Sequence, residues 1–123
     1  MNNPPAVNQY QAQVYHDRTV MIMLDCKPEA FRKDFREWLD ANYHVWTAFD
    51  REANNVWNRG RRKYSQRTIW EYLRHESAIR EVSGPWKMND WYVKDCARLY
   101  EMMHPERAGM FEFRNGQSAV RAA

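Results

Sequence analysis

The sequence predicts a mainly α-helical fold, a compact bundle of about four helices with a helix-turn-helix-like pair and a short N-terminal extended segment. Apolar residues recur every three or four positions through much of residues 28–103, which is the period of an amphipathic helix. Residues that cap or break helices separate these periodic segments. The length of 123 residues suits one domain, and its six Trp predict a core packed largely by aromatic rings.

The N-terminal end shows little periodicity. The first sixteen residues are rich in Asn and Gln and contain paired prolines, so residues 1–18 are expected to form a flexible arm. The apolar run over residues 20–24 predicts a short strand or extended segment on the core, although the period alone does not separate it from a helical turn. One helical domain is expected over residues 19–115, followed by a mobile tail over residues 116–123.

Two helices are predicted between residues 28 and 60. Pro28 suits the first position of a helix because its missing N–H costs nothing there, and the first helix is expected over residues 28–40. Its apolar face comprises Phe31, Phe35, Trp38 and Leu39. Asn42 is the expected cap of the second helix, and Gly60 stands where a left-handed residue would close it. The apolar face of the second helix comprises Val45, Trp46, Phe49, Ala53, Val56 and Trp57.

Two further helices are predicted after Ser65, which is the natural N-cap of the third. The buried stripe of the third helix is read as Ile69, Tyr72 and Leu73, extended by Ile79 and Val82 if the helix persists. The Ser-Gly-Pro sequence of residues 83–85 breaks this pattern. Asn89 or Asp90 is expected to cap the fourth helix, which Pro105 ends. Its apolar stripe comprises Tyr92, Cys96, Leu99, Tyr100 and Met103, and residues 110–113 are expected to pack back on the core.

Positive charge is concentrated between the second and third helices. Residues 59–67 contain five cations and no acid, and no carboxylate occurs from Ala53 through Trp70. Residues 1–58 carry a net charge of −2, whereas residues 59–98 carry +5. This asymmetry predicts an anionic partner for the middle of the chain, and a basic loop leading into a helix N-terminus favours phosphate groups. The alternative is an ordinary solvated basic surface.

The order of helix, turn and helix, with the third helix opening as Ser-Gln-Arg-Thr, matches the outline of a helix-turn-helix. Arg67 and Arg74 lie opposite the predicted apolar stripe, so Arg67 could contact guanine and Gln66 adenine. The basic residues before Ser65 would hold phosphates. Two features oppose base reading: the turn is longer than the usual three or four residues, and Glu71 would repel the backbone. The alternative is a solvated helix on which Arg67 pairs with Glu71.

Nucleic acid is therefore the first expected partner, with DNA favoured over RNA. The candidate nucleic-acid-binding residues are Arg59, Arg61, Arg62, Lys63, Ser65, Gln66, Arg67 and Arg74. Lys87, Lys94 and Arg98 could extend the basic surface, although Asp90 precedes Lys94 by four positions and is its expected partner, which favours an ordinary helix surface there. Three tryptophans do not all fit inward stripes, and they are candidates for a protein interface or a stacking platform for single strands. They are Trp70, Trp86 and Trp91, and the alternative is that their rings cover the edges of the core.

Other kinds of chemistry find little support in the sequence. The four His residues never occur at metal-binding spacings, and the four Gly residues form no phosphate-binding loop. Cys26 and Cys96 lie seventy positions apart, which suggests neither a metal site nor a disulfide framework. We therefore expect no metal, no cofactor and no enzymatic activity. The absence of a signal peptide or of a long apolar run predicts a cytoplasmic protein that does not enter a membrane.

A set of residues within 38–114 resembles small proteins found in bacteriophage and prophage genomes. The matching positions are Trp46, Phe49, Gly60, Arg61, Tyr64, Ser65, Ile69, Arg74, Lys87, Asn89, Tyr92, Ala97, Arg98, Pro105, Phe111 and Arg114. The resemblance implies a phage-encoded accessory protein in the host cytoplasm and supplies no catalytic residues. Such proteins often bind nucleic acid or inhibit host and defence machinery. Residues 1–37 lie outside the resemblance and are a candidate dimerising or partner-binding arm.

Two functions are thus expected from different classes. The first is nucleic-acid binding through the basic loop and the following helix. The alternative is an inhibitor or adaptor, of the anti-defence or anti-CRISPR kind, that binds a host or defence protein through the same basic and tryptophan-rich surface. A structural or assembly protein of the phage particle is a third option.

Overall fold

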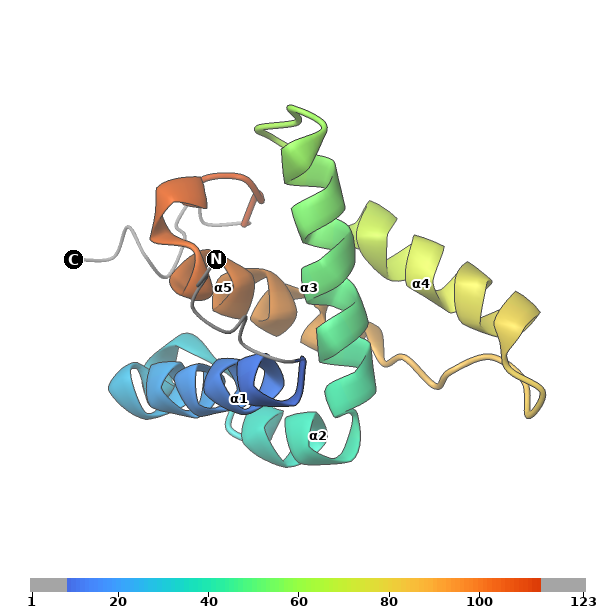
Figure 1. The fold of residues 1–123 in the computed structure, drawn as a ribbon, viewed down its shortest axis with the longest axis horizontal. Helices are drawn as coiled ribbons and strands as arrows, with labels where there is room; N and C mark the ends of the chain where they lie inside the picture. The colour runs from blue at the N-terminus through green and yellow to red at the C-terminus, as the bar shows by residue number, and fades with distance from the viewer. Residues whose placement is uncertain (1–8, 114–123) are drawn as a thin grey trace, which may run out of the picture.

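The computed structural model describes residues 9–113, with side chains from residue 16 onward, and over this range it is an all-α fold without strands (Figure 1). This confirms the predicted fold class. The α-helices of this range are α1 (Gln9–Cys26), α2 (Phe35–Ala41), α3 (Tyr43–Asn58), α4 (Gln66–Arg80) and α5 (Val93–Met103). Short 3₁₀ turns are η1 (Pro28–Ala30), η2 (Asp90–Tyr92) and η3 (Pro105–Arg107).

The first helix corrects the prediction of an extended N-terminal segment. Residues 20–24 lie inside α1, as do residues 9–18 of the expected arm. Val20 and Leu24 are buried and stand four positions apart, so the apolar run contacts the core once per helical turn. An uninterrupted apolar run hides this period, which is why sequence alone does not separate strand from helix here. Residues 1–8 of the expected arm and the expected tail over residues 116–123 fall outside the described residues.

The region predicted as one helix over residues 28–40 is divided in two. Pro28 opens only the single turn η1, because the backbone at Phe31 is extended with φ −122° and ψ 159°. The chain resumes a helix at Phe35, where α2 begins. Asn42 does precede α3 as expected, but its side chain donates to the carbonyl of Trp38 at 3.0 Å instead of capping the new helix.

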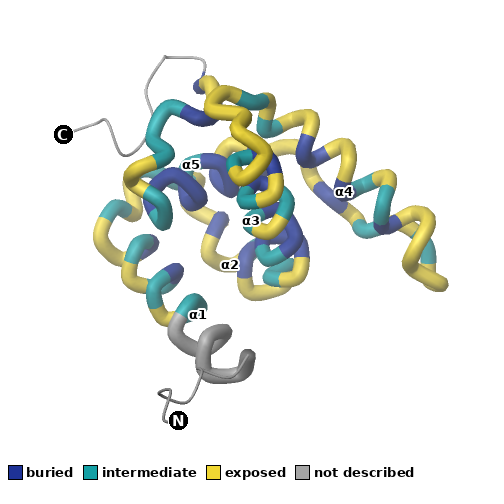
Figure 2. The backbone as a smooth tube through the Cα atoms, turned by 45° about the horizontal axis from the view of Figure 1, so that its top comes forward, coloured by how far each residue is buried: buried dark blue, intermediate teal, exposed yellow. Residues whose placement is uncertain are grey.

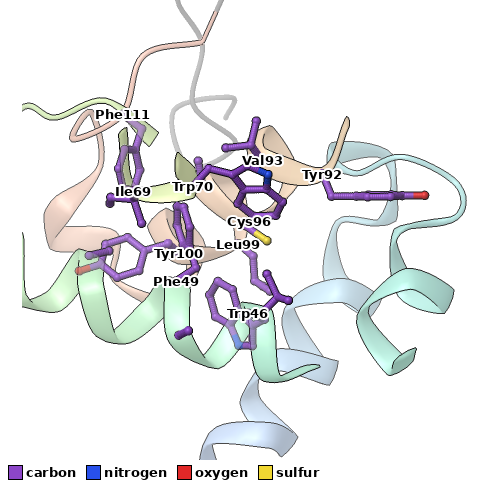
Figure 3. Close-up of a cluster of buried hydrophobic side chains, with 14 of the residues drawn as sticks. Trp46, Phe49, Ile69, Trp70, Tyr92, Val93, Cys96, Leu99, Tyr100 and Phe111 are labelled. Atoms are coloured by element: carbon purple, nitrogen blue, oxygen red, sulfur yellow. The ribbon is translucent and has the colours of Figure 1, made fainter. Parts of the chain in front are cut away.

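Helix α5 occupies the centre of the bundle and contacts α1, α3 and α4. Most of its residues are buried, as Figure 2 shows in dark blue. Large aromatic side chains from α3, α4 and the C-terminal segment surround it (Figure 3). Phe49 illustrates this packing, because its ring centroid lies 6.3 Å from that of Trp70 and 5.7 Å from that of Phe111. The core is therefore aromatic, as the tryptophan content indicates.

Helix α4 is rotated relative to the predicted stripe. Ile69, Trp70 and Leu73 face the bundle, whereas Tyr72 is 43% exposed. Ile79 lies in the last turn of α4 and Val82 lies beyond the end of the helix at Arg80, and both are exposed rather than part of the core. The larger apolar surface of Trp70 takes the inward position, which turns Tyr72 outward. The C-terminal end of α4 extends away from the rest of the bundle (Figure 1).

Candidate nucleic-acid interface

The basic loop, residues 59–65, is closed by backbone hydrogen bonds at both ends. Gly60 has a φ of 88°, and its N–H donates to the carbonyl of Trp57 at 2.9 Å. The N–H of Arg61 donates to the carbonyl of Val56 at 3.2 Å, which completes a Schellman-type end to α3. At the other end, Ser65 accepts from the N–H of Thr68 at 3.2 Å and caps α4. The local signals at Gly60 and Ser65 thus set the loop's boundaries.

The C-terminal segment holds this loop against the bundle. The N–H of Tyr64 donates to the carbonyl of Met110 at 2.9 Å. The side-chain amide of Gln66 donates to the carbonyl of Glu112. The loop is therefore attached to a segment more than forty residues further along the chain. One N–H of the Gln66 amide is engaged in this contact, which orients the side chain toward the C-terminal segment and away from the adenine contact expected of it.

A buried carboxylate in turn anchors the C-terminal segment. Glu101 on α5 has no exposed surface, and its two carboxylate oxygens accept from the N–H groups of Gly109 at 3.1 Å and Phe111 at 2.9 Å. Hydrogen bonds to both oxygens compensate for removing the charge from water. The buried centre of α5 is thereby connected through residues 109–112 to the basic loop.

The cations of the basic loop differ in their surroundings. Arg59, Arg61 and Lys63 are exposed, and none of the ion pairs among the described residues includes them. Arg62 lies over the indole of Trp57, 4.2 Å from the ring centroid, and donates to the carbonyl of the same residue at 2.9 Å. Arg62 therefore fastens the loop to α3, whereas the other three charges face solvent.

Arg74 lies in a different setting from the one expected. It is half-buried, forms ion pairs with Glu71 and Asp90, and donates to the carbonyl of Met88 at 2.8 Å. The hydrogen bond from Arg74 lowers the pKa of the Asp90 carboxyl. Asp90 also lies 3.6 Å from Arg67, so Arg67 pairs with Asp90 and not with Glu71. Arg74 thus joins α4 to η2, and the face expected to read bases is partly neutralised by the fold.

Beside the start of α4 lies an open groove of about 860 Å³, here called the α4 groove. Four cations reach it from separate segments: Arg32, Lys63, Arg67 and Lys94. Its other lining residues are Tyr64, Ser65, Gln66, Asp90, Trp91, Val93 and Glu112. Lys94 lines the groove, in agreement with its expected place on an extended basic surface. Arg32 also lines it but was not among the residues predicted from the sequence. No signal near Arg32 in the sequence points to a site at residues 63–67 or 91.

Arg32 reaches the groove because its backbone is tied to α5. Its N–H donates to Asp95 Oδ1 at 3.2 Å, and its guanidinium lies 5.0 Å from the ring centroid of Trp91. Asp95 is 1% exposed, and burial raises the pKa of its carboxyl to about 6. The other oxygen, Oδ2, has no hydrogen-bond partner among the described residues. A buried, only partly satisfied carboxyl therefore positions one cation of the groove.

The three tryptophans proposed as interface residues differ in how far they are exposed to solvent. Trp70 is fully buried in the core, so it offers no exposed surface to a partner. Trp86 is half-buried, with its ring edge-on to His44 at 4.9 Å and its backbone N–H donating to Ser77 Oγ at 3.0 Å. Trp91 is 62% exposed and lines the α4 groove. Of the three, Trp91 is thus the tryptophan that is both exposed and adjacent to the cations of the α4 groove.

Two histidines connect helices of the bundle, and the buried cysteine Cys96 lies in the core. His16 and His104 both contact the carboxylate of Asp50, at 3.8 and 3.3 Å, and so connect α1, α3 and the end of α5. Within the described residues no group of three His, Cys, Asp or Glu side chains could hold a metal ion. Burial raises the pKa of the Cys96 thiol, which disfavours the thiolate needed for nucleophilic attack.

The described helices include none that is both long and apolar enough to cross a membrane. No family model matches this chain, and comparisons with curated proteins and with solved structures found no similar protein. The geometry of the α4 groove and the basic loop is therefore the basis for inferring function.

Proposed function

We propose that this protein binds nucleic acid through the basic loop and the α4 groove, as a non-catalytic protein of the cytoplasm. The observation that carries the proposal is the convergence of Arg32, Lys63, Arg67 and Lys94 on one groove that also contains an exposed tryptophan. Clustered cations attract the phosphate backbone, and an exposed aromatic ring can stack against a base.

The charge balance around the groove supports an anionic ligand. Two acidic residues, Asp90 and Glu112, line the groove against its four cations. Asp90 pairs with Arg67 and Arg74, and Arg32 pairs with Asp34 at 3.8 Å, so Lys63 and Lys94 are the groove cations outside these ion pairs among the described residues. Neutralised in this way, Asp90 repels a phosphate less than a free carboxylate would. Arg59 and Arg61 on the adjoining basic loop add two exposed charges. The surface is thus more basic than the mild net charge of +3 indicates.

The surroundings of α4 favour phosphate contact over base reading. The amide of Gln66 donates to a carbonyl, and Arg74 is held by two carboxylates. A helix-turn-helix protein needs such side chains free to reach base edges. We therefore propose binding that depends weakly on sequence and strongly on salt.

A titration of labelled duplex and single-stranded oligonucleotides at several salt concentrations tests this proposal. Binding should weaken steeply with salt, and a double variant, Lys63→Ala with Arg67→Ala, should flatten the slope of log affinity against log salt by about 1.4 to 1.8. Arg80→Ala is the matched control, because Arg80 is an exposed cation at the other end of α4, paired with Glu76 at 3.2 Å. Absence of binding at low salt, or an unchanged slope in the double variant, would overturn the proposal.

A protein-binding function is the second candidate, as an inhibitor or adaptor acting on a host or defence protein. The observation that favours it is the exposure of Tyr72, Ile79 and Val82, which extend from the middle of α4 to just beyond its C-terminal end. This surface differs from the expected one, because it lies outside the α4 groove. Ile79→Ser with Val82→Ser should abolish co-purification of a specific partner that Lys63→Ala with Arg67→Ala retains. Light scattering of the same variants reveals whether the partner is a second copy of the chain.

A further inference from the structure

The side chain of Trp91 is held outward by its neighbours. Trp91 lies in the short turn η2, where its backbone N–H donates to Asn89 Oδ1 at 2.9 Å. The next two residues, Tyr92 and Val93, are buried and fix the turn on the core. Tyr92 also donates to Asp34 at 2.8 Å. The backbone of η2 is thus anchored while the indole of Trp91 remains 62% exposed.

The exposed indole is also oriented. The guanidinium of Arg32 lies 5.0 Å from its ring centroid, and Arg32 is tethered through its N–H to the buried Asp95. Such an arrangement limits the rotation of the ring before any ligand arrives, which reduces the entropy lost on binding. Lys94, three positions from Trp91, and Lys63 from the basic loop line the same groove. The exposed indole of Trp91 therefore lies beside positively charged side chains in the groove.

We infer that the α4 groove binds single-stranded nucleic acid, DNA or RNA, with a base stacked on Trp91 and neighbouring phosphates on Lys63, Arg67 and Lys94. This inference rests on the nucleic-acid binding proposed above and specifies its ligand. The bases of a duplex are stacked on one another and cannot offer a face to the indole, whereas an unpaired base can. A groove of about 860 Å³ lies within the size range of sites that bind small organic ligands.

Anisotropy titrations with labelled oligothymidine, oligouridine and a hairpin duplex test the inference. Trp91→Ala should weaken binding of the single strands about 5- to 150-fold, the loss expected for one stacked base, and should leave duplex binding almost unchanged. Trp91→Phe should retain most of the affinity because a phenyl ring still stacks. Tyr72→Ala is the matched control, since it removes an exposed aromatic ring outside the groove. Circular dichroism verifies that each variant is folded.

The outcomes separate this inference from the proposed function. Single-strand binding that is weakened by the predicted factor in Trp91→Ala, with the salt slope unchanged, supports stacking at this site. Equal binding by Trp91→Ala and the original protein, or tighter binding of duplex than of single strands, overturns the inference but leaves nucleic-acid binding intact. If neither the single strands nor the duplex bind the original protein at low salt, both this inference and the proposed function are wrong. Comparing oligothymidine with oligouridine shows whether single-stranded DNA or single-stranded RNA is preferred.

Discussion

The N–H of Phe111 donates to the fully buried carboxylate of Glu101 at 2.9 Å, and this hydrogen bond ties the C-terminal segment to the centre of the bundle. The same segment accepts hydrogen bonds from Tyr64 and Gln66, at the end of the basic loop. A carboxylate inside α5 thus determines where the exposed cations of a distant loop are held.

Replacing Glu101 with Gln should destabilise the protein and loosen the basic loop. Gln supplies one acceptor oxygen where the carboxylate supplies two, so an N–H of Gly109 or Phe111 loses its partner. We expect a loss of about 1–3 kcal/mol in the free energy of unfolding, measured by urea titration. Trypsin should also cleave the basic loop faster in the folded variant. Glu112→Gln, at an exposed position, should change neither measurement.

Asp95 should give stability a distinctive pH dependence. Burial raises the pKa of its carboxyl from 3.8 to about 6, so between these values the unfolded chain ionises while the folded protein keeps the proton. The contribution of Asp95 is therefore full below pH 3.8 and is lost as the pH rises toward 6. Relative to the original protein, Asp95→Asn should gain up to about 3 kcal/mol over this window. Urea titrations at a series of pH values measure the difference, and a constant difference would contradict the pKa shift.

Gly60 should tolerate a side chain poorly even though space is available for one. A Cβ atom at this position would meet no atom within 4 Å, so the cost arises from the φ of 88° alone. We expect Gly60→Ala to lower the free energy of unfolding by about 1–2 kcal/mol. Gly60→Asn should cost less, because Asn adopts the left-handed region more readily. Equal stability of the Ala and Asn variants would mean that the Schellman-type end of α3 relaxes.

Replacement by Ala should cost far more stability at Trp70 than at Trp91. Trp70 is fully buried among aromatic rings, so its removal leaves a large cavity and should cost about 3–5 kcal/mol of stability. Trp91 is mostly exposed, and Trp91→Ala should change stability by less than about 1 kcal/mol, the scale of an exposed cation–π contact. Thermal and urea unfolding of the two variants measure this contrast. Similar stability losses would contradict the different burial of the two rings.

The parts of this fold that could be predicted depend on residues close together in the chain. Gly60 and Ser65 bound the basic loop through hydrogen bonds that span only a few residues, so their roles were evident from the sequence. The candidate site was only partly predictable. Lys63 and Arg67 line the α4 groove, but Arg32 lies about sixty residues from Trp91 and reaches it only after α5 has packed. No local pattern encodes that encounter.

The helical rotation and the pairing of charges were beyond sequence reasoning for a similar reason. Trp70 and Tyr72 both fit a plausible stripe, and the shape of the core selects Trp70 for burial. Asp90 was expected to pair with Lys94 along one helix, yet it pairs with Arg67 and Arg74 on another. Sequence by itself determined the all-α class, the loop boundaries and the concentration of positive charge, because these follow from periodicity, caps and composition. Only the tertiary structure decided which cations remain free and which tryptophan faces solvent, because both depend on contacts between distant segments.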